Sequence, residues 1–294
     1  MLTEFAGRTA VVTGAASGIG LGIARRCADR GMNVVLCDLE SASLVKAARL
    51  IDAPDRVLSV TVDVSDATQV EAAAEATAGR FGAVHLLCNN AGVSVTGRMW
   101  NMTVDDCTWL LGVNIAGVVH GVRSFVPGML GHGEEAHVVN TASLAGLTPM
   151  PNASLYSGTK AAVVAMSESL LFDLRERNAN VGVSVLCPGV VNTKILWSER
   201  NRPRELAETL NRPTSPAVGD YYERSGADPF EVGERVLHAV ERDDFYVLTG
   251  EECRLDIAAR GAALDSLGDP APPRPEAILP DSATDRSGGI PRRS

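Results

Sequence analysis

Near its start the chain reads Thr9-Ala10-Val11-Val12-Thr13-Gly14-Ala15-Ala16-Ser17-Gly18-Ile19-Gly20, an apolar strand-like run that leads into closely spaced glycines and a helix-like segment. Glycines allow a tight turn and a close backbone approach to a pyrophosphate, and a helix N-terminus supplies N–H groups and partial positive charge. A glycine-rich turn alone is common, but its place between a strand and a helix predicts a dinucleotide site. The expected contacts are Gly14, Ser17, Gly18, Ile19 and Gly20.

A second apolar run, residues 33–37, ends in an acid that bears on the choice of cofactor. Asp38 follows the glycines by about 20 residues, where a carboxylate binds the hydroxyls of an adenosine ribose. A carboxylate at this place repels a 2′-phosphate, and no Lys or Arg occurs between Gly14 and Gly20 to attract one. We therefore expect NAD(H) rather than NADP(H), with Leu39 also beside the cofactor.

A tyrosine and a lysine that are four residues apart, Tyr156 and Lys160, follow Ser143 along the chain. Positions i and i+4 lie on one face of a helix, so the two side chains can share a site. A nearby cation favours the phenolate and lowers the pKa of a phenol from its ordinary value of about 10. Such a pair also arises by chance on a solvated helix face. Beside a dinucleotide site, it predicts proton transfer to or from an alcohol or carbonyl.

Together these stretches resemble the short-chain dehydrogenase/reductase family, in the branch with TGxxxGxG and YxxxK motifs. The resemblance covers residues 7–248, and further matches occur in the family's order: Asp63-Val64, Asn89-Asn90-Ala91-Gly92, Asn114 and Pro188-Gly189-Val190-Val191-Asn192-Thr193. It implies that Tyr156 is the acid–base group, that Ser143 binds the substrate oxygen, and that Lys160 holds the nicotinamide ribose. Asn114 is expected to anchor a water on a proton path, or to be a helix-kink residue with a satisfied amide.

The same resemblance implies further cofactor contacts after the later strands. They are Asp63, Val64, Asn90, Ala91, Gly92, Pro188, Gly189, Val191 and Thr193, together with Tyr156 and Lys160. Two of them have an ordinary alternative. Asp63 is of a type that forms turns at strand ends, and Thr193 can cap the helix that follows it.

Short apolar runs alternate with longer Ala-rich helical stretches, which predicts an α/β fold. Strands are expected at 9–13, 33–37, 57–61, 84–88, 136–141, 182–187 and 245–248. Helices are expected at 18–30, 40–51, 66–81, 103–130, 153–177 and 230–242. The nearly continuous apolar strands favour a Rossmann-like, doubly wound, mainly parallel seven-stranded sheet with helices on both faces. Ligand should then bind outside the carboxyl ends of the strands.

Composition narrows the class of protein. The chain has 294 residues and a net charge of -9, which argues against nucleic acid or an anionic membrane as a partner. We expect no membrane span, no signal peptide and a cytoplasmic location. The histidines and cysteines show no metal-ligand spacing, so no metal is expected. One domain over residues 1–264 is expected, followed by a Pro-, Gly- and Ser-rich tail over 265–294 that is disordered or an arm on a neighbour.

The strand–helix alternation breaks at residues 194–229, which we expect to form a lid over the substrate. Its aromatic residues either touch substrate or only pack the lid onto the body. Its arginines favour a solvated surface over an anionic substrate group. The expected pocket is mostly apolar: Val93, Ser94, Leu144, Ala145, Met150, Asn152, Leu196 and Trp197. Such a pocket favours a hydrophobic secondary alcohol or its ketone as substrate.

Two other functions remain open at this point. One is an NADPH-preferring reductase of a ketone or acyl thioester. The other is a non-catalytic regulator that senses NAD(H), although family members of that kind typically lose the tyrosine or the lysine, and this chain keeps Tyr156 and Lys160. The resemblance also implies a homodimer or homotetramer that pairs through the helices at 103–130 and 153–177.

Overall fold

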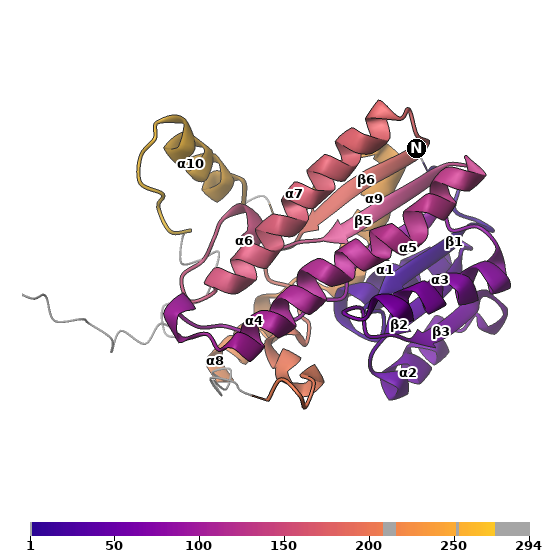
Figure 1. Cartoon of the computed structure of the whole chain (residues 1–294), viewed down its shortest axis with the longest axis horizontal. Coiled ribbons are helices and arrows are strands. Elements are labelled where there is room, and N and C mark those ends of the chain that lie inside the picture. The colour runs from indigo at the N-terminus through magenta and orange to yellow at the C-terminus, as the bar shows by residue number, and fades with distance from the viewer. Residues whose placement is uncertain (1, 208–215, 251–252, 274–294) are drawn as a thin grey trace, which may run out of the picture.

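A parallel sheet lies at the centre of the computed structural model, which describes residues 2–207, 216–250 and 253–273. Its strands are β1 (Thr9–Thr13), β2 (Asn33–Asp38), β3 (Val57–Thr61), β4 (Leu86–Asn89), β5 (Ala136–Thr141), β6 (Val181–Cys187) and β7 (Tyr246–Leu248). The order across the sheet is β3-β2-β1-β4-β5-β6-β7, and every neighbouring pair is parallel. The strands β2 and β3 are therefore added on one side of β1 and the next four on its other side. This change of side between β1 and β4 confirms the doubly wound fold (Figure 1).

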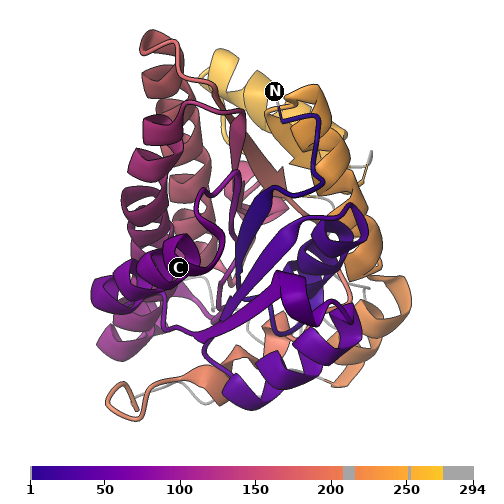
Figure 2. The ribbon, with the colours of Figure 1, turned by 90° about the vertical axis from the view of Figure 1, so that its right-hand side faces the viewer.

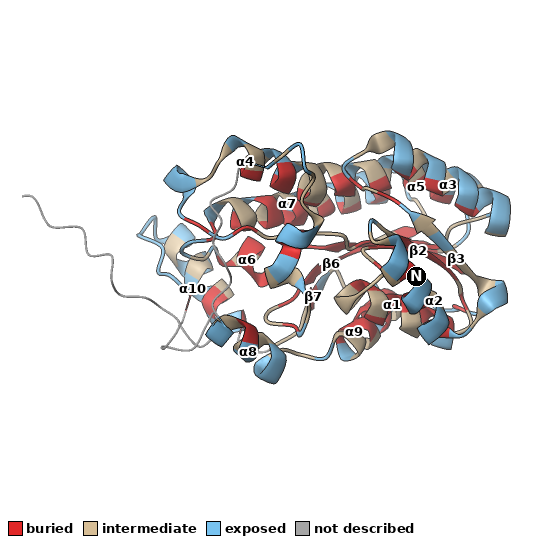
Figure 3. Cartoon of the chain, turned by 90° about the horizontal axis from the view of Figure 1, so that it is seen from below, coloured by how far each residue is buried: buried red, intermediate tan, exposed pale blue. Residues whose placement is uncertain are grey.

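Helices cover both faces of the sheet (Figure 2). One layer holds α1 (Gly18–Asp29), α2 (Ser41–Ile51) and α9 (Pro229–Arg242). The other holds α3 (Ala67–Phe81), α4 (Val104–Leu111), α5 (Gly117–His132) and α7 (Ser154–Glu176). Figure 3 shows the strands buried between these layers, with exposed residues on the outer sides of the helices. Cover on both faces explains why β1 and β5 are buried at every position rather than at alternate ones.

Several shorter elements were not expected from the sequence. The predicted helix at 103–130 is divided by a π-helical turn, Gly112–Ala116. Three further helices are α6 (Leu144–Leu147), α8 (Pro216–Ser225) and α10 (Cys253–Asp265). The 3₁₀ turns are η1 (Pro54–Arg56), η2 (Met99–Asn101) and η4 (Ile195–Asn201). The stretch 194–229 is thus partly helical, while 208–215 and most of the predicted tail, 274–294, lie outside the described residues.

The run Val104–His132 is the one described helical run long and apolar enough, by length and composition, to cross a membrane. Half of its apolar window is buried inside the protein. Its members α4 and α5 pack against α7 and α3 on one face of the sheet. It is therefore a core helix of the α/β fold.

A buried histidine lies in β5. His137 has no exposed surface, and its Nε2 lies 2.8 Å from the hydroxyl of Ser184. That hydroxyl donates its own proton to the carbonyl of Asp244, so the neutral imidazole carries its proton on Nε2. The Asp243 carboxylate lies 3.7 Å from Nδ1, but burial outweighs its attraction and lowers the pKa of His137 to about 3.

This burial should make the fold sensitive to acid. In the unfolded chain His137 has its ordinary pKa of about 6.5, whereas in the folded protein its pKa is about 3. Between these two pH values the unfolded chain therefore binds a proton that the folded protein does not. Its contribution to stability is therefore complete above pH 6.5 and is lost as the pH falls toward 3. Urea unfolding should show about 2 kcal/mol less stability at about pH 5 than at about pH 7.5 from this group. His137→Gln should reduce that dependence, whereas the exposed His238→Gln should not. Equal pH dependence in both variants would contradict this assignment.

Candidate active site

Side chains of interest gather at the carboxyl ends of the strands. Asp38 is the last residue of β2, and Asn90 directly follows β4. Ser143 and Gly189 come just after β5 and β6. Parallel strands end at one edge of a sheet, so residues far apart in the chain meet there. This is the edge at which the sequence predicts ligand.

The glycine turn after β1 is built for a close approach. Gly14 and Gly18 adopt φ values of +64° and +56°, which favour glycine. A Cβ on Gly20 would lie 2.2 Å from the carbonyl oxygen of Gly14, so this position has no room for a side chain. Ser17 is the N-cap of α1, and its side chain makes no cap hydrogen bond. The result is a bare backbone cradle at a helix N-terminus, and it fits a dinucleotide pyrophosphate.

Asp38 is fastened to this turn. Its Oδ2 accepts a hydrogen bond from the backbone N–H of Ala16 at 2.9 Å, and its Oδ1 accepts one from Glu40 at 3.0 Å. Leu39 lies next to it and is 44% exposed. The carboxylate is half-buried and fixed in direction, and its remaining lone pairs can accept hydrogen bonds from ribose hydroxyls.

Asn90 links the strand ends through its amide. The Nδ2 group donates to the carbonyl of Thr13 at 3.0 Å, and Oδ1 accepts from the hydroxyl of Thr141 at 3.3 Å. The backbone N–H of Ala91 donates to the Thr13 hydroxyl at 3.0 Å. The absence of a side chain at Gly92 leaves room for the Lys160 ammonium, because a Cβ there would lie only 3.3 Å from Nζ. These residues shape the floor of the site, with the Asn90 amide engaged in holding β1, β4 and β5 together.

Tyr156 and Lys160 lie on one face of α7, as predicted. The Lys160 side chain is buried, donates to the carbonyl of Thr141 at 2.9 Å, and places Nζ 5.9 Å from the centroid of the Tyr156 ring. Burial lowers the pKa of Lys160 to about 8. Ser143 caps α6 by accepting from the N–H of Ala145 at 3.1 Å, which fixes its hydroxyl beside Tyr156.

The charge state of the phenol differs from the expectation. Burial raises the pKa of Tyr156, and hydrogen bonding with Ser143 lowers it by less, so the net direction is upward. Desolvation of the phenol, which depends on the packed protein, is the largest cause of this difference. In the protein alone the phenol of Tyr156 is therefore protonated at neutral pH, which suits a proton donor.

Asn114 lies in the π-helical turn and is completely buried. Its Oδ1 accepts from the N–H of Val93 at 2.9 Å, while Nδ2 donates to the Val93 carbonyl at 3.0 Å and to the Thr159 hydroxyl at 3.1 Å. Both N–H bonds of the amide are thus used within the protein. These contacts match the helix-kink interpretation, and π turns recur at functional sites.

Other predicted cofactor residues have internal partners. Asp63 accepts from the N–H and the hydroxyl of Ser65 at 2.9 and 2.7 Å, as a turn-forming residue does. Val64 and Val191 are buried in the core. Among the residues after β6, the Pro188 carbonyl accepts from Leu144 at 2.9 Å and the Gly189 N–H donates to Thr249 at 3.0 Å.

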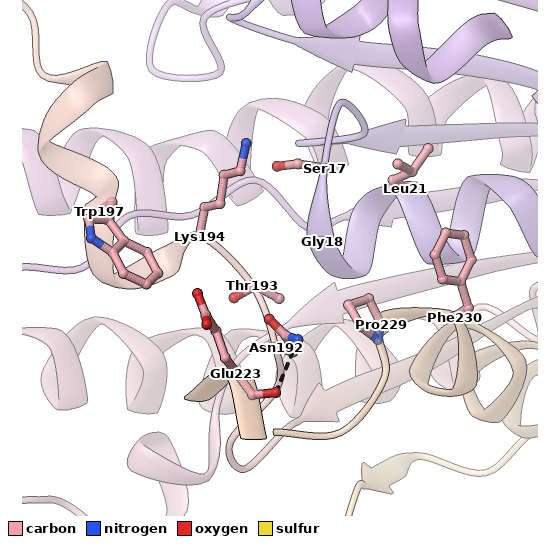
Figure 4. A pocket seen from close by; sticks show the side chains of 10 residues that line it. All are labelled: Ser17, Gly18, Leu21, Asn192, Thr193, Lys194, Trp197, Glu223, Pro229 and Phe230. Atoms are coloured by element: carbon pink, nitrogen blue, oxygen red, sulfur yellow. Dashed lines mark hydrogen bonds between the residues drawn. The ribbon is translucent and has the colours of Figure 1, made fainter. Parts of the chain in front are cut away.

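A cavity of about 270 Å³ lies between the glycine turn and the segment after β6 (Figure 4). It is lined by Ser17, Gly18, Leu21, Asn192, Thr193, Lys194, Trp197, Glu223, Pro229 and Phe230. In Figure 4 the amino group of Lys194 points toward Ser17, and Trp197 lies across the cavity. Trp197 was predicted for substrate, but it lines this cavity beside the glycine turn. Sequence reasoning missed Lys194 and Glu223, since no local pattern marks them.

The predicted pocket residues lie in several settings. Val93 belongs to an apolar cluster with Val95, Trp109 and Leu110, against which Tyr156 and Leu206 pack. Leu144 and Ala145 are buried, and Met150 and Leu196 are half-buried. The backbone N–H of Ser94 donates to the Ser198 hydroxyl at 3.1 Å. Asn152 is exposed, with φ +58°, and its carbonyl accepts from Gly97 at 2.6 Å.

Two of the three arginines in residues 194–207, Arg200 and Arg202, pair with carboxylates of the body, which corrects the expectation of a solvated surface for these two. Arg202 donates to Asp106 of α4 at 2.5 Å, and both side chains are buried, with exposed fractions of 6% and 0%. Its guanidinium also stacks over Trp109 at 4.5 Å. Arg200 pairs with Glu40 at 2.9 Å. These contacts fasten η4 to the body on two sides.

A second phenol, that of Tyr222, lies on α8. Burial raises the pKa of Tyr222 to about 12, and the charge of Tyr156 adds to this shift, so the two phenols are within electrostatic reach. Gly219 on the same helix packs on Trp197, because a Cβ there would lie 3.2 Å from the indole. Tyr222 is one of the aromatic residues of the 194–229 stretch that the sequence predicts either to touch substrate or only to pack onto the body.

Comparison with known proteins gives close relatives over most of the chain. A CLA biosynthesis dehydrogenase/reductase of Lactiplantibacillus plantarum is 32% identical over 263 residues, or 85% of this chain and 91% of that protein. A 1-deoxy-11-beta-hydroxypentalenate dehydrogenase of Streptomyces arenae is 37% identical over 228 residues, or 76% of this chain and 80% of that protein. A short-chain dehydrogenase/reductase of Burkholderia phymatum, solved in complex with NAD, superimposes with a TM-score of 0.87 and 39% identity over 92% of this chain and 99% of that chain.

The family model described as short chain dehydrogenase matches residues 8–204, which include the glycine turn, Ser143, Tyr156 and Lys160. The relatives share the fold over nearly its whole length. The chain therefore belongs to the short-chain dehydrogenase/reductase family of oxidoreductases.

Proposed function

We propose that the protein is an NAD(H)-dependent oxidoreductase that interconverts a hydrophobic secondary alcohol and its ketone. The observation that carries the cofactor proposal is the Asp38 carboxylate, which the glycine turn holds through the N–H of Ala16 at 2.9 Å. A carboxylate there favours ribose hydroxyls and repels a 2′-phosphate. The NAD complex of the Burkholderia relative and the hydroxypentalenate dehydrogenase of Streptomyces support the same cofactor and reaction type.

The proposed mechanism assigns one task to each polar side chain. When bound, the cofactor supplies the nicotinamide ring that exchanges a hydride with the alcohol carbon. Ser143 holds the substrate oxygen, and Tyr156 gives a proton to that oxygen in reduction or accepts it in oxidation. Lys160, whose Nζ lies beside the Gly92 backbone, keeps positive charge near the phenol and holds the cofactor ribose. Asn114 holds the Val93 backbone in place below them.

The substrate class follows from the apolar surroundings of Tyr156. The cluster of Val93, Val95, Trp109 and Leu110 lies next to the ring, and Leu206 of the 194–229 stretch packs on the same cluster. We propose that this stretch is the lid and that a hydrophobic alcohol lies between it and the cluster. Tyr222 would then provide a hydroxyl to a polar group of the substrate.

The remaining proposals concern organisation. We propose one catalytic domain over residues 1–264, a cytoplasmic location, and a homodimer or homotetramer that pairs through α5 and α7. An almost wholly apolar hollow of about 200 Å³ on these two helices supports such pairing. Its apolar lining is Val118, Val119, Val122, Met166 and Leu170.

A titration with NADH and NADPH, followed by nicotinamide fluorescence, tests the cofactor proposal. Wild type should bind NADH at least about tenfold more tightly, a difference of about 1.4 kcal/mol. Asp38→Asn keeps the size of the side chain but removes its charge, so it should narrow this preference. Asp29→Asn is the matched control, because that exposed carboxylate lies at the end of α1 opposite the glycine turn and pairs with Arg25 and Arg26. Equal binding of both cofactors by wild type would refute the proposal.

A further inference from the structure

An arginine of the lid reaches the loop that follows the ribose-binding strand. Nε of Arg200 donates to Oε1 of Glu40 at 2.9 Å, across 160 positions of sequence. Its Nη1 donates to the carbonyls of Lys194 and Trp197 at 3.0 and 2.9 Å. The guanidinium is thus oriented by the backbone of η4 and by one carboxylate of the body.

That carboxylate belongs to the residue two positions after Asp38. The backbone N–H of Glu40 donates to Oδ1 of Asp38 at 3.0 Å, and its Oε2 accepts from the hydroxyl of Ser43 at 3.0 Å. Burial raises the pKa of Glu40, but hydrogen bonds from Asn201 and Ser43 and the charge of Arg200 together lower it by more. The net pKa is below the ordinary value, so Glu40 is an anion at neutral pH. Asp38, Glu40 and Arg200 therefore form one connected group of charges.

The segments that carry Asp38 and Glu40 supply no cation of their own, and the lysine whose amino group points toward Ser17, Lys194, comes from the segment after β6. Neither the glycine turn, Gly14–Gly20, nor residues 38–45 contain a Lys or Arg. The three connected side chains carry a net charge of minus one, from two carboxylates and one guanidinium. An arginine is well suited to bind a phosphate through two parallel hydrogen bonds, but here a carboxylate occupies its Nε edge.

We propose that Glu40 is a second determinant of cofactor choice, because it keeps Arg200 engaged and so withholds it from a 2′-phosphate on the adenosine ribose. This rests on the proposed binding of that ribose at Asp38. Without the charge of Glu40 the group would be neutral, and the guanidinium would be free to pair with a phosphate dianion. A ribose hydroxyl carries no charge, so the affinity for NADH should depend on Asp38 and not on this pair.

The test compares NADH and NADPH dissociation constants for wild type, Glu40→Gln, Arg200→Gln and the double variant. Glu40→Gln should tighten NADPH about tenfold and change NADH by less than about threefold. In the double variant the gain for NADPH should disappear. Ser43→Ala is the matched control, since it removes a hydrogen bond to Glu40 without changing charge, and its NADPH affinity should equal that of wild type.

Two results would overturn the proposal: NADPH binding that Glu40→Gln leaves unchanged, or a gain that persists without Arg200. Glu40 is the N-cap of α2, so Glu40→Ser provides a second charge-free variant with a favourable capping residue. The gain should weaken at high salt, because the pair is about one-third exposed. Failure of the NAD(H) proposal itself would appear separately, as equal binding of the two cofactors by wild type and no effect of Asp38→Asn.

Discussion

Tyr156→Phe is expected to lower turnover by about 10²- to 10⁴-fold while leaving NADH binding nearly unchanged. The ring packs beside the cluster of Val93 and Trp109, and phenylalanine preserves those contacts. The variant lacks only the hydroxyl that exchanges a proton with the substrate oxygen. Steady-state oxidation of a hydrophobic secondary alcohol, together with an NADH titration, measures both quantities.

Tyr246→Phe is the matched control for this prediction. Tyr246 is 51% exposed and its hydroxyl donates to Glu168, away from the proposed site, so its loss should leave turnover within about twofold of wild type. Near-normal turnover in Tyr156→Phe would refute the proposed mechanism. Loss of NADH binding in that variant would show instead that the ring is needed to build the cofactor site.

The raised pKa of Tyr156 gives the reaction a pH dependence with a defined sign. Oxidation needs the phenolate, whose fraction increases with pH until the pKa is reached, so the oxidation rate should rise from neutral to alkaline pH. Reduction needs the phenol and should not rise over the same range. Lys160 loses its charge above a pH of about 8, which should make the rise in oxidation shallower than tenfold per unit.

Arg202→Met is expected to destabilise the fold, or to release residues 194–207 from it, at a cost of about 3–5 kcal/mol. The substitution would leave the Asp106 carboxylate, which has no exposed surface, without the cation that lies 2.5 Å from it. The guanidinium also covers Trp109, so its loss removes packing as well as charge. Urea unfolding measures the stability, and limited proteolysis between residues 194 and 229 measures release of the lid.

Two controls separate the buried pair from a general effect of removing an arginine. Arg224→Met breaks a pair in which the side chains are 78% and 61% exposed, and should cost less than about 1 kcal/mol. Asp106→Asn combined with Arg202→Met removes both charges and should recover part of the loss. Equal stability of Arg202→Met and Arg224→Met would contradict the assignment of Arg202 as the anchor of residues 194–207.

The fold was largely predictable because its signals are local. The inner strands are short, mostly apolar runs buried on both faces, and the crossover helices between them are read from their own periodicity. The division of the 103–130 helix was not predictable, because the π-helical turn depends on the bonds between the Asn114 amide and the Val93 backbone. The short α6 and α8 likewise rely on contacts outside their own residues, such as that between Gly219 and Trp197.

The sequence predicted where several candidate residues lie, but not all of their contacts. The positions of Ser143, Tyr156 and Lys160 follow from helix geometry and from where strands end. The side-chain contacts of Asn90 and Asp63 were not predictable, because both side chains form hydrogen bonds within the protein that depend on neighbouring strands and turns. Lys194 and Glu223 carried no recognisable pattern, and only the folded chain brings them to the cavity beside the glycine turn.

By itself the sequence determined the order of strands and helices, the glycine turn and the side chains at the carboxyl edge of the sheet, because these depend on spacing along the chain. Only the tertiary structure decided the partners of the arginines and the direction of the phenol's pKa. Asp106 and Arg202 are 96 positions apart, and Glu40 and Arg200 are 160 apart, so no local pattern links them. The pKa of Tyr156 depends on how much water the surrounding chain excludes, and that is a property of the packed protein.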